Sequence, residues 1–269
     1  MHDFQVVMLA SGSKGNSALI RTAKQNFLVD MGISCRALTT KLKALDLTVQ
    51  DLDAVFLTHE HIDHVRGLAT FTKNYQVPIF SSENTWRAIL AKDNKIERHS
   101  CRLITDKLQL GDIKITSFAI PHDAIDPHGY TFINCCDNSK CSYLTDTGFI
   151  TDIVREAVSG SDTLILEANH DVELLKNGSY PYQLKQRILS TRGHLSNEGA
   201  GWFLNEMDKL PQKVILAHLS EENNRPQLAL DTVKNILDTN KRLQETELFV
   251  ASQKEMVADF PLQTMLNVK

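Results

Sequence analysis

The sequence predicts an α/β fold with mixed β-sheets, in which two β-rich halves pack face to face with helices outside. Three observations favour this four-layer α/β/β/α sandwich. The chain has 269 residues, of which 42% are hydrophobic, so it can bury a sizeable core. β-prone runs precede a helix and then alternate with helices, and this order occurs roughly twice. No composition break separates two domains, so we expect a single domain over residues 1–269.

The elements are predicted from hydrophobic periodicity and from turn residues. Short runs of β-branched and aromatic residues predict strands at 4–9, 18–21, 26–30, 53–57, 77–80, 107–110, 113–120, 130–134, 142–145, 163–166, 213–217 and 247–251. Apolar residues at helical spacing predict helices at 34–46, 65–75, 150–159, 180–190, 197–208 and 225–240, with a further helix opening at an N-cap, Ser82.

The run His59-Glu60-His61-Ile62-Asp63-His64 contains three imidazoles and one carboxylate within six positions. These are ligand types that first-row divalent metals prefer. A polar surface loop is the alternative, but the flanks argue against it, because a buried strand ends at Leu57 and a helix follows. Ligands of α/β sheets gather at the carboxyl ends of strands. The run therefore predicts a metal site.

Three more ligand-type residues follow apolar runs in the same way. These residues are His122, Asp146 and His218. Taken singly, each is more often a cap or turn residue than a metal ligand. All three recur directly after a predicted strand, which favours a shared site because a catalytic metal takes ligands from several strand ends.

Composition excludes several function classes. The net charge is −4, which does not fit a protein that coats nucleic acid through a broad basic face. Five cysteines, with no C-x-x-C pair, fit reduced thiols rather than disulfides, and Cys136 and Cys141 fit a hairpin better than a metal pair. No signal peptide and no apolar run of membrane-spanning length is visible, so we expect a cytoplasmic protein without membrane contact. The oligomeric state is not indicated.

These motifs resemble the metallo-β-lactamase fold superfamily. The resemblance runs in order through nearly the whole chain, from the His cluster to His218. The segments Ser11–Ser17, Leu166–Asp171 and Gly193–Ser196 are similar to the YycJ/WalJ branch in particular, which is associated with bacterial 5′-to-3′ exonuclease activity. The chain is too short for the β-CASP domain of RNase J-type relatives, and it lacks the exosite arm of tRNase Z.

The resemblance implies two divalent ions, for which Zn, Mn and Fe all suit the ligands. One ion would be held by His59, His61 and His122, and the other by Asp63, His64 and His218. Asp146 would bridge them. A carboxylate can span two ions about 3.5–4 Å apart.

Two further residues are implied to act in catalysis. By resemblance, His194 would be the general acid and Glu167 the carboxylate that orients it. A Glu–His hydrogen bond fixes the tautomer of the ring and favours its protonated form. The alternative for His194 is an N-cap of the helix that starts near Ser196. Secondary candidates are His170, Asn169 and Thr58, the last as a group that orients the His loop.

The loop between the first two strands is a candidate phosphate site. Its backbone amides and hydroxyls form a compact turn, and a lysine adds a charge. A plain tight turn explains it equally well, since the P-loop spacing is absent. Candidate phosphate contacts are Ser11, Ser13, Lys14, Asn16 and Arg192, with Arg187 as a further possibility.

The predicted function is a metal-dependent phosphodiesterase acting on nucleic acid, and the resemblance implies a 5′-to-3′ DNA exonuclease. A metal-bridging hydroxide, held in place by Asp63 and Asp146, would attack the phosphate in line, and His194 would protonate the leaving 3′-oxygen. One alternative is a small-molecule metallo-hydrolase of the same fold, cutting a cyclic phosphodiester, thioester or lactone. A non-enzymatic metal module is another, but structural zinc sites are usually Cys-rich and closed.

Overall fold

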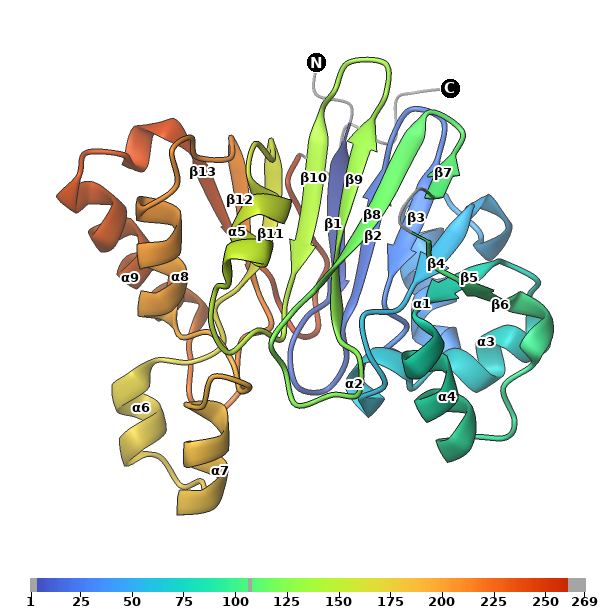
Figure 1. Ribbon diagram of the computed structural model, residues 1–269, viewed down its shortest axis with the longest axis horizontal. Coiled ribbons are helices and arrows are strands. Elements are labelled where there is room, and N and C mark those ends of the chain that lie inside the picture. Colours follow the sequence, from blue (N-terminus) through green and yellow to red (C-terminus); the bar gives the residue numbers. More distant parts are fainter. Residues whose placement is uncertain (1–3, 106–107, 261–269) are drawn as a thin grey trace. The chain divides into compact units, whose positions relative to one another are not determined.

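The computed structural model describes residues 4–105 and 108–260 and divides into two compact units. Unit 1 comprises Met1–Thr105, Ala124–Asp126 and Gln253–Lys269, and unit 2 comprises Asp106–Asp123 and Pro127–Ser252. Each unit contains one mixed sheet with its own helices and hydrophobic core (Figure 1). The predicted two mixed sheets with helices are confirmed, whereas a single domain over the whole chain stays a prediction.

The sheet of unit 1 has the strand order β14-β1-β2-β3-β4-β5-β6. Its strands are β1 (Gln5–Ala10), β2 (Ser17–Arg21), β3 (Asn26–Val29), β4 (Ala54–Phe56), β5 (Ile79–Ser81), β6 (Cys101–Leu103) and β14 (Val257–Ala258). Pairing is antiparallel from β14 to β3 and parallel from β3 to β6. The parallel strands β3, β4 and β5 are almost continuously buried.

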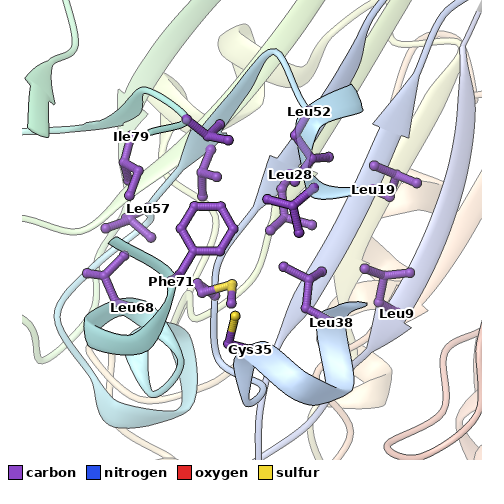
Figure 2. Packing of buried hydrophobic residues seen from close by; sticks show 14 of the residues in the cluster. Leu9, Leu19, Leu28, Cys35, Leu38, Leu52, Leu57, Leu68, Phe71 and Ile79 are labelled. Atoms are coloured by element: carbon purple, nitrogen blue, oxygen red, sulfur yellow. The ribbon is translucent and has the colours of Figure 1, made fainter. Parts of the chain in front are cut away.

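The helices of unit 1 pack against this sheet through apolar stripes. They are α1 (Cys35–Lys43), α2 (Ile62–Val65), α3 (Leu68–Asn74) and α4 (Glu83–Lys92), with 3₁₀ turns at Val49–Asp51 and Arg98–Ser100. Figure 2 shows Phe71 of α3 beside Leu28 and Leu57 from the sheet side and Cys35 of α1. Burying a side chain of this size contributes about 1.5–3 kcal/mol. The core therefore anchors the chain on either side of the His cluster.

The sheet of unit 2 has the order β13-β12-β11-β10-β9-β8-β7. Its strands are β7 (Leu108–Leu110), β8 (Ile113–Ala119), β9 (His128–Asn134), β10 (Lys140–Leu144), β11 (Thr163–Glu167), β12 (Lys213–Ala217) and β13 (Glu247–Val250). Pairing is antiparallel from β7 to β10 and parallel from β10 to β13. The parallel half brings the carboxyl ends of β10, β11 and β12 to one edge.

The helices of unit 2 are α5 (Asp152–Val158), α6 (Val172–Asn177), α7 (Tyr182–Ile188), α8 (Asn197–Asn205) and α9 (Pro226–Thr239), with a 3₁₀ turn at Leu243–Glu245. Residues of α5, α8 and α9 form one apolar cluster with β8, β10, β11 and β12, including Val154, Leu166, Phe203 and Val233. No helix in the described ranges is long and apolar enough to cross a bilayer.

The structure corrects some of the predicted elements. The helix predicted over 65–75 begins later, as α3 at Leu68, because the chain turns at Gly67, whose N–H donates to the Met31 carbonyl (2.9 Å). Val65 is instead the last residue of α2. The short elements α2, β6, α6 and β14 were not predicted. Lys107, the first residue of a predicted strand, lies outside the described residues. The hairpin around Asp137 and the strand over 213–217 are confirmed, and the described cysteines form no disulfide.

Candidate metal centre

Unit 1 holds the ligand loop, which we define as residues 59–64. It follows β4 and runs into α2. The ring of His59 lies 4.5 Å from that of His61 and 4.1 Å from that of His64, between centroids. His59 and His64 are buried, whereas His61 and Asp63 are half-buried. The loop thus gathers three imidazoles and one carboxylate.

Asp30 fixes the orientation of His64. It follows β3 directly, with a positive φ of 63°, and is fully buried. Its carboxylate accepts hydrogen bonds from His64 Nδ1 (2.7 Å) and from the Thr58 backbone N–H (2.9 Å). Burial raises the pKa of Asp30, although the His64 ring and the Thr58 hydrogen bonds oppose the shift. With Nδ1 engaged by Asp30, His64 would ligate a metal through Nε2.

The sequence reasoning did not select Asp30. The sequence did contain an indication of its role, because Asp30 is a ligand-type residue after an apolar strand, as is Asp146. A single carboxylate at that place has no motif around it, so it was not distinguished from a turn residue.

Thr58 and Asn16 complete the surroundings of the ligand loop. The Thr58 hydroxyl lies 2.9 Å from His59 Nδ1 and 3.0 Å from either oxygen of Asp30. The buried amide of Asn16 lies 3.2 Å from Asp63 Oδ2 and 3.1 Å from His64 Nε2. Asn16, predicted as a phosphate contact, therefore contacts two residues of the ligand loop in the structure.

Gly32 allows the ligand loop to lie against the Ser11–Ser17 turn. The backbone N–H of Asn16 donates to the Asp63 carbonyl (2.7 Å), and that of Gly32 donates to the Asn16 carbonyl (2.9 Å). A Cβ at Gly32 would lie 1.7 Å from the Asp63 oxygen. A larger residue at this position would therefore displace Asp63. In the same turn Ser11 is buried, whereas Ser13 and Lys14 are exposed.

In unit 2, three acidic and imidazole groups meet at the carboxyl ends of parallel strands. Asp146 follows β10, Glu167 ends β11, and His218 follows β12. Asp146 and His218 have positive φ angles of 59° and 56°, which L-residues rarely adopt. Such backbone strain is typical of functional sites.

Glu167 contacts two imidazoles at once. Its Oε1 lies 2.8 Å from His194 Nδ1 and 2.9 Å from His218 Nδ1. Its Oε2 accepts hydrogen bonds from the N–H groups of Thr147 (2.8 Å) and Leu195 (3.1 Å). Burial alone would raise the pKa of Glu167, but the two imidazoles prevail and hold it below its usual range. The second imidazole partner was not predicted from the sequence.

His194 lies at the edge of this group. Its side chain is about one-fifth exposed, and its Nδ1 lies 3.8 Å from Asp146 Oδ1. The alternative N-cap role is wrong, because Ser196 caps α8 by accepting a hydrogen bond from the Gly199 N–H (3.0 Å). Each of Asp146, Glu167, His194 and His218 has one ligand atom within 4.8 Å of the others. Within this group, Asp146 and His218 are of the ligand types that divalent metals accept, while Glu167 and His194 contact each other.

His122 approaches the same group from β8. Its Nδ1–H donates to the Gly193 carbonyl (3.1 Å), and its Nε2 lies 3.8 Å from Asp146 Oδ1. Burial lowers the pKa of His122, which keeps the ring neutral as a metal ligand must be. The Arg192 guanidinium donates to the His122 carbonyl (3.1 Å). Arg187 is paired with Asp123.

Asn169 and His170 follow β11. The Asn169 amide donates to the His218 carbonyl (2.7 Å), so it holds the backbone of a candidate ligand. His170 is buried, and burial lowers its pKa to about 4. Among the described residues, neither ring nitrogen of His170 has a hydrogen-bond partner.

The chain has relatives of known name. Over 240 residues it is 41% identical to "Exodeoxyribonuclease WalJ" of Streptococcus pneumoniae serotype 2 (strain D39 / NCTC 7466), covering 87% of this chain and 88% of that protein. It is 36% identical over 234 residues to "Exodeoxyribonuclease YycJ" of Bacillus anthracis, covering 86% and 88%.

Solved structures share the fold at low sequence identity. The metallo-β-lactamase fold protein YhfI of Bacillus subtilis superposes with a TM-score of 0.69, at 18% identity, over 95% of this chain and 99% of that one. The short form of human tRNase Z has a TM-score of 0.63, at 17% identity, over 94% and 98%. The predicted metallo-β-lactamase fold is thereby confirmed. Since residues 25–219 match the Beta-lactamase superfamily domain and the first relatives are matched over most of their length, this chain belongs to the β-lactamase superfamily, in the family of WalJ and YycJ.

Proposed function

We propose that this protein is a metal-dependent DNA exonuclease that cleaves in the 5′-to-3′ direction. The observation that carries the proposal is the 36–41% identity, over most of the chain, with relatives named exodeoxyribonucleases. The buried, hydrogen-bonded His and carboxylate groups of each unit support the metal-dependent part of it.

We further propose that two ions, drawn from Zn, Mn and Fe, bind to the seven ligand-type residues. His59, His61, Asp63 and His64 would serve from unit 1, and His122, Asp146 and His218 from unit 2. Support comes from each group separately. Asp30 holds Nδ1 of His64, and Glu167 holds Nδ1 of His218, so both rings are oriented for ligation through Nε2. When bound, divalent ions supply charge neutralisation at a phosphate and activation of water.

His194 is the proposed proton donor. Its Nδ1 is held by Glu167, so Nε2 is the nitrogen that would hold the proton for transfer. In the reaction, a water-derived oxygen forms a bond to phosphorus, the bond from phosphorus to the 3′-oxygen breaks, and that oxygen takes the proton from His194. Asp63 and Asp146 would orient the attacking oxygen. A partly exposed ring suits this role, because it must reach substrate and then regain a proton from solvent.

The test measures metal content and cleavage on the same purified protein. We expect bound divalent metal, chelator-sensitive hydrolysis of bis(p-nitrophenyl) phosphate, and stepwise release of nucleotides from the 5′-end of labelled DNA. Single- and double-stranded DNA and RNA would be compared. Metal-dependent hydrolysis of the small phosphodiester without action on any nucleic acid would favour the small-molecule hydrolase. No turnover with any metal would overturn the enzyme proposal.

We also propose that the enzyme works in the cytoplasm. Five cysteines without a disulfide suit a reducing compartment. The exposed Ser13 and Lys14 remain candidate contacts for a substrate phosphate.

A further inference from the structure

Unit 2 contains a cavity of about 370 Å³ beside the proposed proton donor. His194 forms part of its wall, together with Phe149, His170, Trp202 and the Arg155–Glu206 pair. Its volume is within the usual range of small-molecule pockets, roughly 300–1,000 Å³. A group bound there would lie next to the atoms that His194 protonates.

Two aromatic rings of this cavity are only half covered by protein. Phe149 is 43% exposed, and Trp202, on α8, is 49% exposed. Side chains of this size usually bury more of their area. Aromatic rings at a nucleic-acid site act as stacking platforms for bases, because every base has an aromatic face. The pair therefore suits a flat, aromatic ligand.

His170 adds hydrogen-bonding groups that the protein does not use. Its side chain is 1% exposed and lines the cavity, yet neither ring nitrogen has a partner in the described part of the chain. A buried polar atom without a partner is costly, so such groups commonly await a ligand. A neutral imidazole offers one donor and one acceptor. That combination matches the edge of a nucleobase, which also carries both.

The charges of the cavity argue against a phosphate as its occupant. Arg155 is paired with Glu206, with 3.1 Å between Nη2 and Oε2, and lies 5.3 Å from the Phe203 ring centroid. Its positive charge is thus balanced locally. Apart from His194, the pocket presents aromatic faces and the imidazole of His170, which favour an uncharged, planar ligand.

We propose that this cavity binds the nucleobase of the nucleotide on the leaving-group side of the scissile phosphate. The inference rests on the proposed function and deepens it. His194 gives its proton to the 3′-oxygen, so the nucleotide that carries this oxygen lies on the His194 side. In 5′-to-3′ cleavage this is the released nucleotide. The base would stack on Trp202 and Phe149 and form hydrogen bonds with His170.

The first test compares two substrates on matched variants. One oligonucleotide is normal, and the other lacks the base of its 5′-terminal nucleotide. The wild-type enzyme should lose roughly tenfold or more in kcat/KM on the abasic substrate, the usual weight of one stacked base. Trp202→Ala should lose a similar factor on the normal substrate, mainly through KM, and little more on the abasic one. Tyr182→Ala, an aromatic residue that is 75% exposed and outside the cavity wall, should behave like the wild type.

His170→Phe separates the hydrogen bonds from the shape of the ring. This change keeps a planar ring but removes both nitrogens, so it should raise KM for the normal substrate and leave KM for the abasic substrate unchanged. Equal cleavage of both substrates by the wild type, or an equal penalty of Trp202→Ala on both, would overturn the proposal. Such results would leave the exonuclease itself intact, whereas no cleavage of either substrate would count against the proposed function.

A second test does not depend on activity. The chain has two tryptophans, and Trp86 is buried in unit 1. The difference in fluorescence between wild type and Trp202→Ala therefore reports on Trp202 without altering Trp86. Deoxyadenosine should quench this difference signal in metal-free protein, and deoxyribose should not. Absence of quenching by deoxyadenosine would overturn the pocket assignment.

Discussion

The two units present metal-ligand types in opposite ways. In unit 1, His59, His61, Asp63 and His64 come from one loop of six residues, so local chain geometry brings them together. In unit 2, Asp146 and His218 come from separate strand ends, so the pairing of β10, β11 and β12 brings them together. Local motifs can be read from sequence, whereas sites built by a sheet appear only when its strand order is known.

Both units nevertheless use the same device, a buried carboxylate that holds imidazoles by Nδ1. Asp30 holds one ring, that of His64, and Glu167 holds two, those of His194 and His218. The pKa shifts of the two carboxylates differ in direction. With one imidazole, burial prevails and the pKa of Asp30 is raised, whereas with two the pKa of Glu167 is lowered.

Removing one proposed ligand from either unit should have the largest effect. We expect His61→Ala in unit 1 and Asp146→Ala in unit 2 each to lose bound metal and to reduce cleavage to background, because an ion held by few ligands loses much of its affinity with one of them. Metal analysis and nuclease assays measure this. His99→Ala and Asp231→Ala, at exposed positions, are the matched controls. Full metal content and a full cleavage rate in either variant would show that the altered residue is not a metal ligand.

Removing the proposed proton donor should have the next largest effect. His194→Ala should keep its metals but cleave DNA roughly a hundredfold more slowly, the usual weight of a general acid. Hydrolysis of bis(p-nitrophenyl) phosphate should slow much less, since its leaving group needs no proton. A full rate on DNA at all pH values would show that His194 is not the acid.

The two buried carboxylates should differ in a smaller but measurable way. Outer-shell partners of metal ligands typically contribute 10–100-fold in affinity or activity. We expect the loss for Glu167→Gln to be near the upper end of this range, because Glu167 holds two imidazole rings. The loss for Asp30→Asn should be near the lower end, because Asp30 holds one. Glu167→Gln should also slow cleavage of DNA more than hydrolysis of bis(p-nitrophenyl) phosphate, because Glu167 orients His194, and Asp30→Asn should slow both alike. Glu173→Gln, exposed on α6, serves as control. Equal effects of the two substitutions on both substrates would mean that the number of rings does not matter.

The smallest expected effect concerns acid stability and His170. The pKa of His170 is lowered from an ordinary value near 6.5 to about 4 by burial, although Glu167 and Asp171 oppose the shift. Between these values the unfolded chain binds a proton that the folded protein does not, so stability falls as pH falls through this window. The loss is about 1 kcal/mol per pH unit.

Urea unfolding of metal-free protein between pH 6.5 and 4.5 measures this slope. His170→Asn removes the titrating group, so its stability should depend less steeply on pH than that of the wild type. Identical slopes would show that His170 is not held neutral by burial. His64 in unit 1 differs from His170, because it is also buried but its Nδ1 lies 2.7 Å from the Asp30 carboxylate.

Features formed by neighbouring residues could be predicted from the sequence. Features formed by contacts between distant parts of the chain could not. The ligand loop was found because its residues are adjacent, and the strand over 213–217 because it is uniformly apolar after its first residue. The break at Gly67 was missed, since it depends on a contact with Met31 far back in the chain. Asp30 and the second partner of Glu167 were missed for the same reason. Their significance lies in which imidazole they reach across the sheet, and spacing along the chain does not encode that.

The left-handed backbone of Asp146 and His218 has a consequence for how such a protein evolves. Glycine would adopt these angles without strain, and replacing a strained residue by glycine commonly relaxes about 1 kcal/mol. A chain carrying Asp146→Gly or His218→Gly would then withstand heat at least as well as its parent while lacking a functional group. Selection for thermal robustness alone would therefore not preserve these two side chains.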